Sequence, residues 1–160
     1  MTILNIATSP RKEKSASRAV VDAFLREYMT QADDIVVDTL DVWQEWLPEF
    51  DAETINAKYK GVSGEPMTPA EVTAWEKIRE LASRFQRADR IVMGVPMWNF
   101  SFPYKLKQLI DLICQRNMLF TFDGKRYGPS LDIAKAFVAF VRGQATRSDL
   151  KRFRSPGSSI

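Results

Sequence analysis

Apolar residues along the chain fall into two kinds of pattern, short continuous runs and stripes with helical spacing. The continuous runs have the length of β-strands, and they predict four strands, at residues 3–7, 35–40, 91–96 and 134–141. The run at 91–96 is apolar throughout, which is typical of a strand that is buried on both faces of a sheet.

The stripes predict amphipathic helices between these strands. After the first strand the stripe consists of Val21, Phe24, Leu25 and Tyr28. After the third strand it consists of Leu106, Leu109, Ile110, Ile113 and Cys114. Because it belongs to this stripe, Cys114 is expected to be a small core residue. The irregular region 41–67 is expected to contain one short helix, near residues 52–59.

A further helix has a clear start signal at Thr68. Pro69 suits the first helical position, and Glu71 completes a capping box with the threonine. We expect this helix to end within residues 87–89. Its predicted buried face consists of Val72, Trp75, Ile78, Ala82 and Phe85.

Strands that alternate with helices predict an α/β fold, with a doubly wound parallel sheet covered by helices on both faces. Sheets of this class bind ligands at the carboxyl ends of their strands. The loops expected to carry function are therefore 8–17, 96–103 and the segment from residue 142 onward.

The amino-acid composition excludes several kinds of catalytic and metal site. The chain of 160 residues is long enough for one domain, and it contains one cysteine and no histidine. Histidine-based catalysis, Cys/His zinc sites and an internal disulfide are thus excluded, so no metal site is predicted, and the difficult chemistry of an enzyme of this composition would be that of a cofactor. Without a signal-peptide pattern or a membrane-length apolar run, we expect a cytoplasmic protein with no membrane partner.

The net charge of +3 is unevenly distributed. Residues 142–160 hold five basic side chains and one acidic side chain, whereas residues 1–141 carry a net charge of −1. The basicity therefore belongs to a tail. A nucleic-acid or membrane arm is one interpretation of this tail, but it has no amphipathic stripe and a single aromatic residue, Phe153, so we expect no nucleic-acid partner.

The first loop combines hydroxyl groups and cations at the start of a helix. Ser9, Ser15 and Ser17 lie there with several Arg and Lys residues. Free N–H groups and the helix dipole at such a position suit an anion, and a phosphomonoester fits better than a dinucleotide because GxGxxG and P-loop motifs are absent. The alternative interpretation is that Ser15 is only a helix cap and that the charges are solvated.

The second loop is unusually apolar for its position. Met97, Trp98 and Phe100 follow a buried strand, and Asn99 between them can both donate and accept hydrogen bonds. Such a loop can form a wall for a planar ligand whose polar edge Asn99 would meet. The alternative is a patch that packs into the core or into an interface.

The two loops together carry a family resemblance. Ser9-Pro10-Arg11 with Ser15-Ala16-Ser17, and the stretch 94–100 followed by Pro103, resemble the FMN-dependent NADH-azoreductases of the flavodoxin-like NAD(P)H:quinone oxidoreductases. This resemblance extends from the first strand to about residue 143.

The resemblance implies a homodimer with one FMN per subunit, which NADH or NADPH reduces and quinones or azo compounds reoxidise in a ping-pong cycle. Ser9 and residues 15–17, including Ala16, would hold the FMN phosphate. Met97, Trp98, Asn99 and Phe100 would line the flavin ring, and the third loop would contribute Arg142 and Gly143. Hydride passes to the flavin, so no side chain has to act as an acid or a base.

The end of the chain departs from this family. Family members continue beyond the fourth strand with a fifth strand and a final helix, so this chain is expected to lack both and to be about 40 residues short. The expected organisation is an FMN-binding domain at 1–144 and a poorly ordered basic tail at 145–160. The alternative function is that of a truncated or diverged paralogue, which binds flavin or dimerises without turnover.

Overall fold

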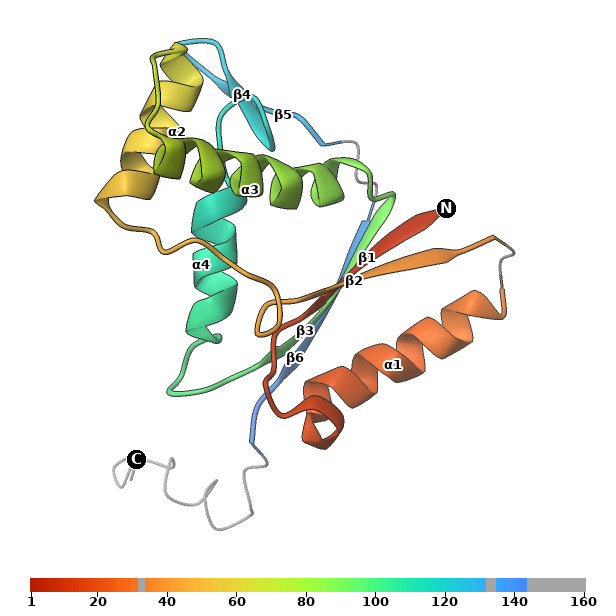
Figure 1. Ribbon diagram of the computed structural model, residues 1–160. Coiled ribbons are helices and arrows are strands. Elements are labelled where there is room, and N and C mark those ends of the chain that lie inside the picture. Colours follow the sequence, from red (N-terminus) through yellow and green to blue (C-terminus); the bar gives the residue numbers. More distant parts are fainter. Residues whose placement is uncertain (32–33, 132–134, 144–160) are drawn as a thin grey trace, which may run out of the picture.

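Four parallel strands form the central sheet in the spatial order β2-β1-β3-β6 (Figure 1). The strands are β1 (Thr2–Ala7), β2 (Val36–Asp41), β3 (Arg90–Pro96) and β6 (Lys135–Val141). This computed structural model describes residues 1–31, 34–131 and 135–143. The four strands predicted from the apolar runs are confirmed, and so is the parallel doubly wound arrangement.

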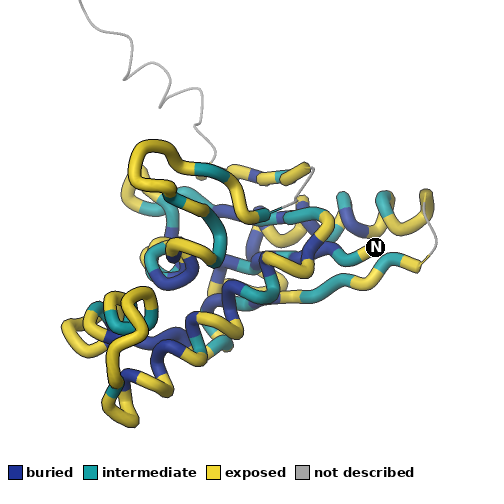
Figure 2. The backbone as a smooth tube through the Cα atoms, turned by 90° about the horizontal axis from the view of Figure 1, so that it is seen from above, coloured by how far each residue is buried: buried dark blue, intermediate teal, exposed yellow. Residues whose placement is uncertain are grey.

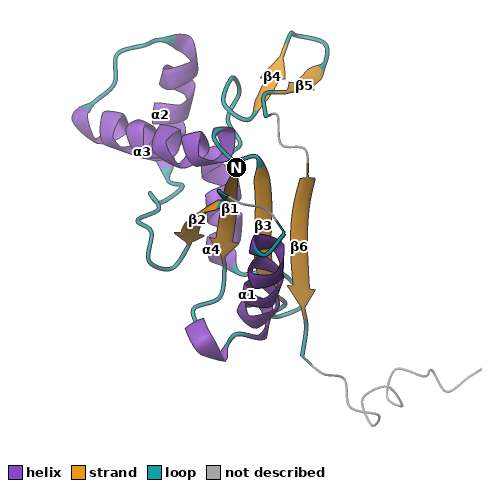
Figure 3. Cartoon of the chain, turned by 90° about the vertical axis from the view of Figure 1, so that its right-hand side faces the viewer, coloured by secondary structure: helices purple, strands orange, loops and turns teal. Residues whose placement is uncertain are grey.

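Helices cover both faces of the sheet (Figure 3). One face carries α1 (Ala16–Met29), which follows the 3-10 turn Lys12–Lys14 and contacts β3 and β6. The other face carries α3 (Pro69–Gln86) and α4 (Tyr104–Ile113), and α2 (Ala52–Ser63) packs against α3. The helices that connect successive strands therefore lie on both sides of the sheet, as the alternation of strands and helices predicts.

Each face of the sheet has its own apolar cluster. On the α3 and α4 face, Leu4 and Ile6 of β1 pack with Ile78 of α3. On the α1 face, Ile3 and Val92 pack with α1. Since Ile91 and Met93 contact the first cluster, β3 contributes side chains to both, which explains its continuous apolar run. Figure 2 shows the buried segments gathered between the layers and the exposed ones on the outer surface.

The start of α3 follows the sequence prediction and adds a contact from another helix. The Oγ1 of Thr68 accepts from the N–H of Glu71, and the Glu71 carboxylate accepts from the N–H of Thr68. Lys60 of α2 also donates to both oxygens of this buried carboxylate, at 2.9 and 2.8 Å. The Glu71 carboxylate thus both caps α3 and holds α2 against α3 through Lys60.

A two-stranded hairpin follows α4, in a segment where the sequence pattern predicts no element. It consists of β4 (Phe120–Phe122) and β5 (Tyr127–Pro129), which pair antiparallel. Tyr127 stacks on Phe122 with the ring centroids 4.6 Å apart, and the Arg116 guanidinium lies 5.8 Å from the centroid of the Phe122 ring. These strands are only three residues long, which is too short for the sequence to show an alternating hydrophobic pattern.

Two predictions of burial were wrong. Val72 was expected on the buried face of α3, but it is exposed, and Glu71 and Leu81 are buried instead. Cys114 was expected in the core, but it is exposed because α4 ends at Ile113, and the chain leaves helical geometry at the cysteine. Gln115 occupies the fully buried position that follows.

The predicted tail at 145–160 lies outside the described residues, and so does Gln144. Within the part of the chain that the structure describes, no helix combines the length and the apolarity that crossing a membrane requires.

Candidate functional site

The carboxyl ends of β1, β3 and β6 lie at one edge of the sheet and are tied together by hydrogen bonds. The hydroxyl of Thr8 donates to the carbonyl of Gly94 at 2.7 Å, which joins the ends of β1 and β3. The N–H of Met97 donates to the carbonyl of Val141 at 2.7 Å, which joins the ends of β3 and β6. The three loops selected from the sequence therefore start from a common, fixed edge.

The first loop places buried hydroxyl groups at the start of α1. Ser15 is the N-cap of the helix, and its Oγ accepts from the N–H of Arg18 at 3.3 Å. The hydroxyl groups of Ser15 and Ser17 lie 3.0 Å apart, and both side chains are buried. Ser9 is buried at the end of β1, and its Oγ accepts from the N–H of Arg11 at 3.4 Å. The interpretation of Ser15 as a helix cap is thus confirmed by a hydrogen bond, and its contact with a ligand stays a prediction.

Backbone N–H groups at this helix start are available to a ligand. The N–H groups of Lys14 and Ser15 are used in the preceding turn. Those of Ala16 and Ser17 have no acceptor among the described residues, as expected at the first turn of a helix. Two N–H donors and neighbouring serine hydroxyls form a donor set that suits a phosphate group.

Gly94 of β3 allows this helix start to approach the sheet. A Cβ at position 94 would lie 2.9 Å from the carbonyl oxygen of Ser17 and 3.2 Å from the side chain of Val21. The absence of a side chain at Gly94 thus sets the height of α1 above the strand ends, and with it the position of the donors.

The second loop forms a tight turn from Trp98 to Ser101. The two residues exchange backbone hydrogen bonds of 2.8 and 2.9 Å. Asn99 and Phe100 at the centre both have positive φ, at 49° and 62°, a combination that type I′ turns require. Phe100 is 90 % exposed although it occupies a backbone region that aromatic residues disfavour. Strain of this kind is concentrated at functional sites.

The predicted wall residues therefore differ in burial. Met97 and Trp98 are half-buried, whereas Asn99 and Phe100 project from the turn into solvent. The loop is not packed into the core of this chain, so its apolar side chains are available to a ligand or to an interface.

Trp43 links the two loops and was not among the predicted site residues. Its indole N–H donates to the carbonyl of Thr8 at 2.9 Å. Its ring centroid lies 6.3 Å from that of Trp98 and 5.4 Å from that of Tyr104. The signal in the sequence was its position directly after β2, because the carboxyl end of this strand lies at the same edge of the sheet.

Ser9 and Ser17 line a groove of about 690 Å³ between α1 and the strands β1 and β2. The lining of this groove includes Gly94 and none of the residues 97–100. Arg142 and Gly143 are exposed and directly follow β6, beside the Met97–Val141 bond. The structure thus brings the first two predicted loops and the described start of the third, residues 142 and 143, to one edge, and the groove adjoins the first loop.

Positive charge surrounds the first loop. Arg11, Lys12 and Lys14 are exposed there, and Arg18 lies 3.9 Å from Glu13 and 3.6 Å from Asp22. Among the described residues, no group of His, Cys, Asp and Glu has the arrangement of a metal site. The site is thus a set of hydroxyl, amide and cationic groups suited to an anion, bordered by an aromatic loop.

Comparison with known proteins shows which family and which relatives this chain resembles. Residues 1–157 match the model of a family described by its flavodoxin-like fold. The chain is 59 % identical over 145 residues to FMN-dependent NADH:quinone oxidoreductase 2 of Burkholderia lata, an alignment that covers 91 % of this chain and 70 % of the relative. It is 46 % identical over 156 residues to oxidoreductase 9 of the same organism, covering 98 % and 71 %.

A solved structure gives the same result in three dimensions. An azoreductase from Bacillus anthracis superposes with a TM-score of 0.82 at 26 % identity, covering 89 % of this chain and 69 % of that one. The sequence resemblance and the observed fold thus agree with independent comparisons. The chain belongs to the flavodoxin-like family that includes the FMN-dependent NADH:quinone oxidoreductases.

Proposed function

We propose that this protein is an FMN-dependent oxidoreductase, which passes a hydride from NADH or NADPH through the flavin to quinones or azo compounds. The family membership and the names of the relatives support the cofactor, the donor and the acceptor class. The observation that carries the proposal is the phosphate-type donor set at the start of α1, beside a strained aromatic turn on the neighbouring strand.

The first loop would hold the phosphate of FMN. Ser9, Ser15 and Ser17 offer hydroxyl groups, and the N–H groups of Ala16 and Ser17 lie in the first turn of α1, at the positive end of the helix dipole. Basic side chains around the loop add attraction for the dianion without having to touch it.

The other two loops would hold the flavin ring. Met97, Trp98 and Phe100 offer apolar contacts, and Asn99 offers an amide that can match the polar edge of the ring. Arg142 and Gly143 would meet it from the end of β6. When bound, FMN supplies the hydride chemistry, so these residues only have to orient the ring and exclude water.

We further propose that the active form is a cytoplasmic homodimer. Asn99 and Phe100 project from the carboxyl edge into solvent, and Tyr104 beside them is also exposed. A second copy that covers this edge would complete the wall around the flavin, which one chain leaves open. The segment 1–144 is proposed to be the flavin-binding domain.

Flavin content is the first test. The purified protein, with and without added FMN, should be yellow and should retain about one FMN per chain after gel filtration. Steady-state oxidation of NADH with a soluble quinone then tests turnover. A colourless protein that FMN cannot reconstitute would refute the proposal, whereas a yellow protein without turnover would establish the alternative of an inactive flavin-binding paralogue.

A further inference from the structure

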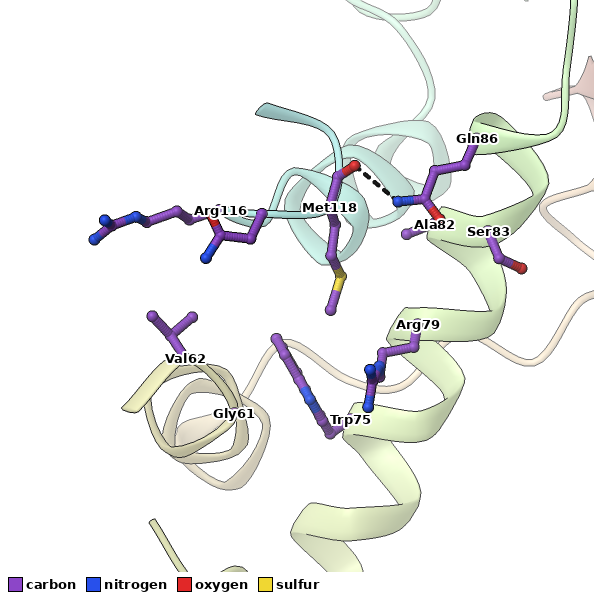
Figure 4. Close-up of a pocket in the computed structure, with 10 residues that line it drawn as sticks. Gly61, Val62, Trp75, Arg79, Ala82, Ser83, Gln86, Arg116 and Met118 are labelled. Atoms are coloured by element: carbon purple, nitrogen blue, oxygen red, sulfur yellow. Dashed lines mark hydrogen bonds between the residues drawn. The ribbon is translucent and has the colours of Figure 1, made fainter. Parts of the chain in front are cut away.

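A second cavity of about 410 Å³ lies between α2, α3 and the segment that follows α4 (Figure 4). Its lining combines apolar, amide and cationic side chains, and consists of Gly61, Val62, Trp75, Arg79, Ala82, Ser83, Gln86, Arg116, Asn117 and Met118. None of the proposed flavin-binding residues belongs to this set.

The cavity lies at the opposite end of the sheet from the candidate flavin site. α4 begins after the carboxyl end of β3 and runs back along the sheet, so residues 116–118 lie near the amino ends of the strands. The side chain of Gln86, four residues before β3, donates to the carbonyl of Met118 at 2.9 Å. This bond closes one side of the cavity and fixes its wall.

Trp75 and Met118 form the apolar part of the cavity. Trp75 is only 8 % exposed, and the Met118 side chain points toward its indole (Figure 4). The backbone of α2 lies directly against the indole, because a Cβ on Gly61 would be 2.2 Å from the Cε2 atom of Trp75. The ring therefore has a fixed position at the floor of the cavity.

The polar part of the cavity is positively charged. No Asp or Glu belongs to its lining. Arg79 and Arg116 form no ion pair with any other residue in the described part of the chain. In Figure 4 the Arg79 side chain runs down toward Trp75, whereas Arg116 extends outward at the rim. Asn117 adds an amide that can donate further hydrogen bonds.

We propose that this cavity is a second binding site, for a small planar aromatic anion such as a carboxylate or sulfonate. The ring of the ligand would lie against Trp75 and Met118, and its anionic group would pair with Arg79, with Arg116 and Asn117 at the rim. Arg79 has no ion-pair partner in the described part of the chain and lies beside an apolar floor, which favours this class because one ligand can both pair with the guanidinium and bury apolar surface.

Naphthalene-2-sulfonate is a suitable probe, titrated by calorimetry into protein that is saturated with FMN so that the flavin site is occupied. We expect saturable binding with one site per chain. The Arg79→Gln variant should bind the probe about tenfold more weakly, and the neutral 2-naphthylmethanol should bind wild-type protein about tenfold more weakly than the sulfonate. Arg116→Gln should have a smaller effect, about threefold, because this side chain lies at the rim.

Arg26→Gln is the matched control, since Arg26 lies on α1 at the other face of the sheet, and it should leave probe binding unchanged. Thermal unfolding of each variant shows that it is folded; Arg79 and Arg116 are exposed, so their melting temperatures should stay close to that of wild type. The proposal is overturned if wild-type protein shows no saturable binding, if Arg79→Gln binds as wild type does, or if the neutral compound binds equally well.

Discussion

At the scale of single residues, Ser15 combines a structural and a functional role. It caps α1 through the N–H of Arg18, and its hydroxyl belongs to the donor set beside Ser17. Ser15→Ala should lower the free energy of unfolding by about 1 kcal/mol, because one helix donor loses its acceptor. It should also weaken FMN binding, as measured by fluorescence titration.

Thr68→Ala provides the matched control for this prediction. Thr68 caps α3 through the N–H of Glu71, away from the three loops. Its loss should cost a similar amount of stability and leave FMN affinity unchanged. If both variants lost FMN affinity equally, the effect at Ser15 would be one of stability alone.

Phe100 is a second residue at which conformation and function conflict. Its positive φ of 62° costs about 1 kcal/mol for a residue with a side chain, and at 90 % exposure little packing offsets that cost. Phe100→Gly should therefore stabilise the free protein by up to about 1 kcal/mol in urea unfolding, and it should weaken FMN binding because the aromatic wall is lost.

Asn117→Gly is the corresponding control, since Asn117 has a similar φ of 64° but lies at the other end of the sheet. It should give a smaller gain in stability, because asparagine tolerates this conformation, and no change in FMN binding. FMN binding as tight in Phe100→Gly as in wild type would show that Phe100 does not contribute to the flavin wall.

At the scale of elements, the contact between α2 and α3 depends on Gly61. A methyl group at this position would overlap the Trp75 indole, so the two helices would have to separate. Gly61→Ala should lower the free energy of unfolding by about 1–3 kcal/mol, measured by urea denaturation. Ser63→Ala changes an exposed residue at the end of the same helix and should have little effect. An unchanged Gly61→Ala protein would mean that α2 is free to move on α3.

The same pair of helices carries a pH-dependent contact. The Lys60 ammonium that donates to the Glu71 carboxylate, with help from the Thr68 N–H, lowers the pKa of Glu71 below its usual value near 4.5. A lowered pKa means that the stabilisation is complete above the ordinary value and is lost as pH falls through the lowered one. Wild-type stability should therefore decline below about pH 4.5 more steeply than that of Glu71→Gln.

Urea titrations at a series of pH values compare the two proteins, and Glu76→Gln serves as control because it removes an exposed carboxylate from the same helix without touching Lys60. Parallel pH profiles for wild type and Glu71→Gln would show that the Lys60 contact contributes nothing to the acid dependence.

Local signals were sufficient to predict most elements but not their packing partners. The capping box predicted the start of α3, and continuous apolar runs predicted four strands, because both patterns depend on neighbours in sequence. The contact of Lys60 with Glu71 and the position of Trp43 between two loops depend on tertiary structure, and no local pattern contains them. Cys114 was misplaced because helical periodicity does not show where a helix ends.

The grouping of the candidate loops was predictable for a different reason. At the scale of the whole molecule, parallel topology brings the carboxyl ends of all strands to one edge, so loops far apart in sequence could be grouped before the structure was known. What topology does not provide is the exposure of each side chain. The loop at 97–100 was left open between a ligand wall and a patch that packs into the core or into an interface, and the structure shows that Asn99 and Phe100 face solvent.

The sheet as a whole ends at β6, whose free edge has no partner strand among the described residues. Phe140 on this strand is 62 % exposed, and Val138 is also exposed. An open, apolar edge strand is a template for pairing with another chain. We therefore predict that Phe140→Lys reduces concentration-dependent self-association in sedimentation velocity, and that it changes the free energy of unfolding by less than about 0.5 kcal/mol.

Val20→Lys separates the edge effect from a general loss of exposed apolar surface. Val20 is 45 % exposed, but it lies on α1, where no strand can add. Self-association should fall in Phe140→Lys and persist in Val20→Lys. If both lysines reduced it equally, association would follow total apolar surface, and the edge would have no special role. If neither did, pairing of chains through the β6 edge would be refuted, and the homodimer proposed at the exposed turn of Asn99 and Phe100 would not be affected.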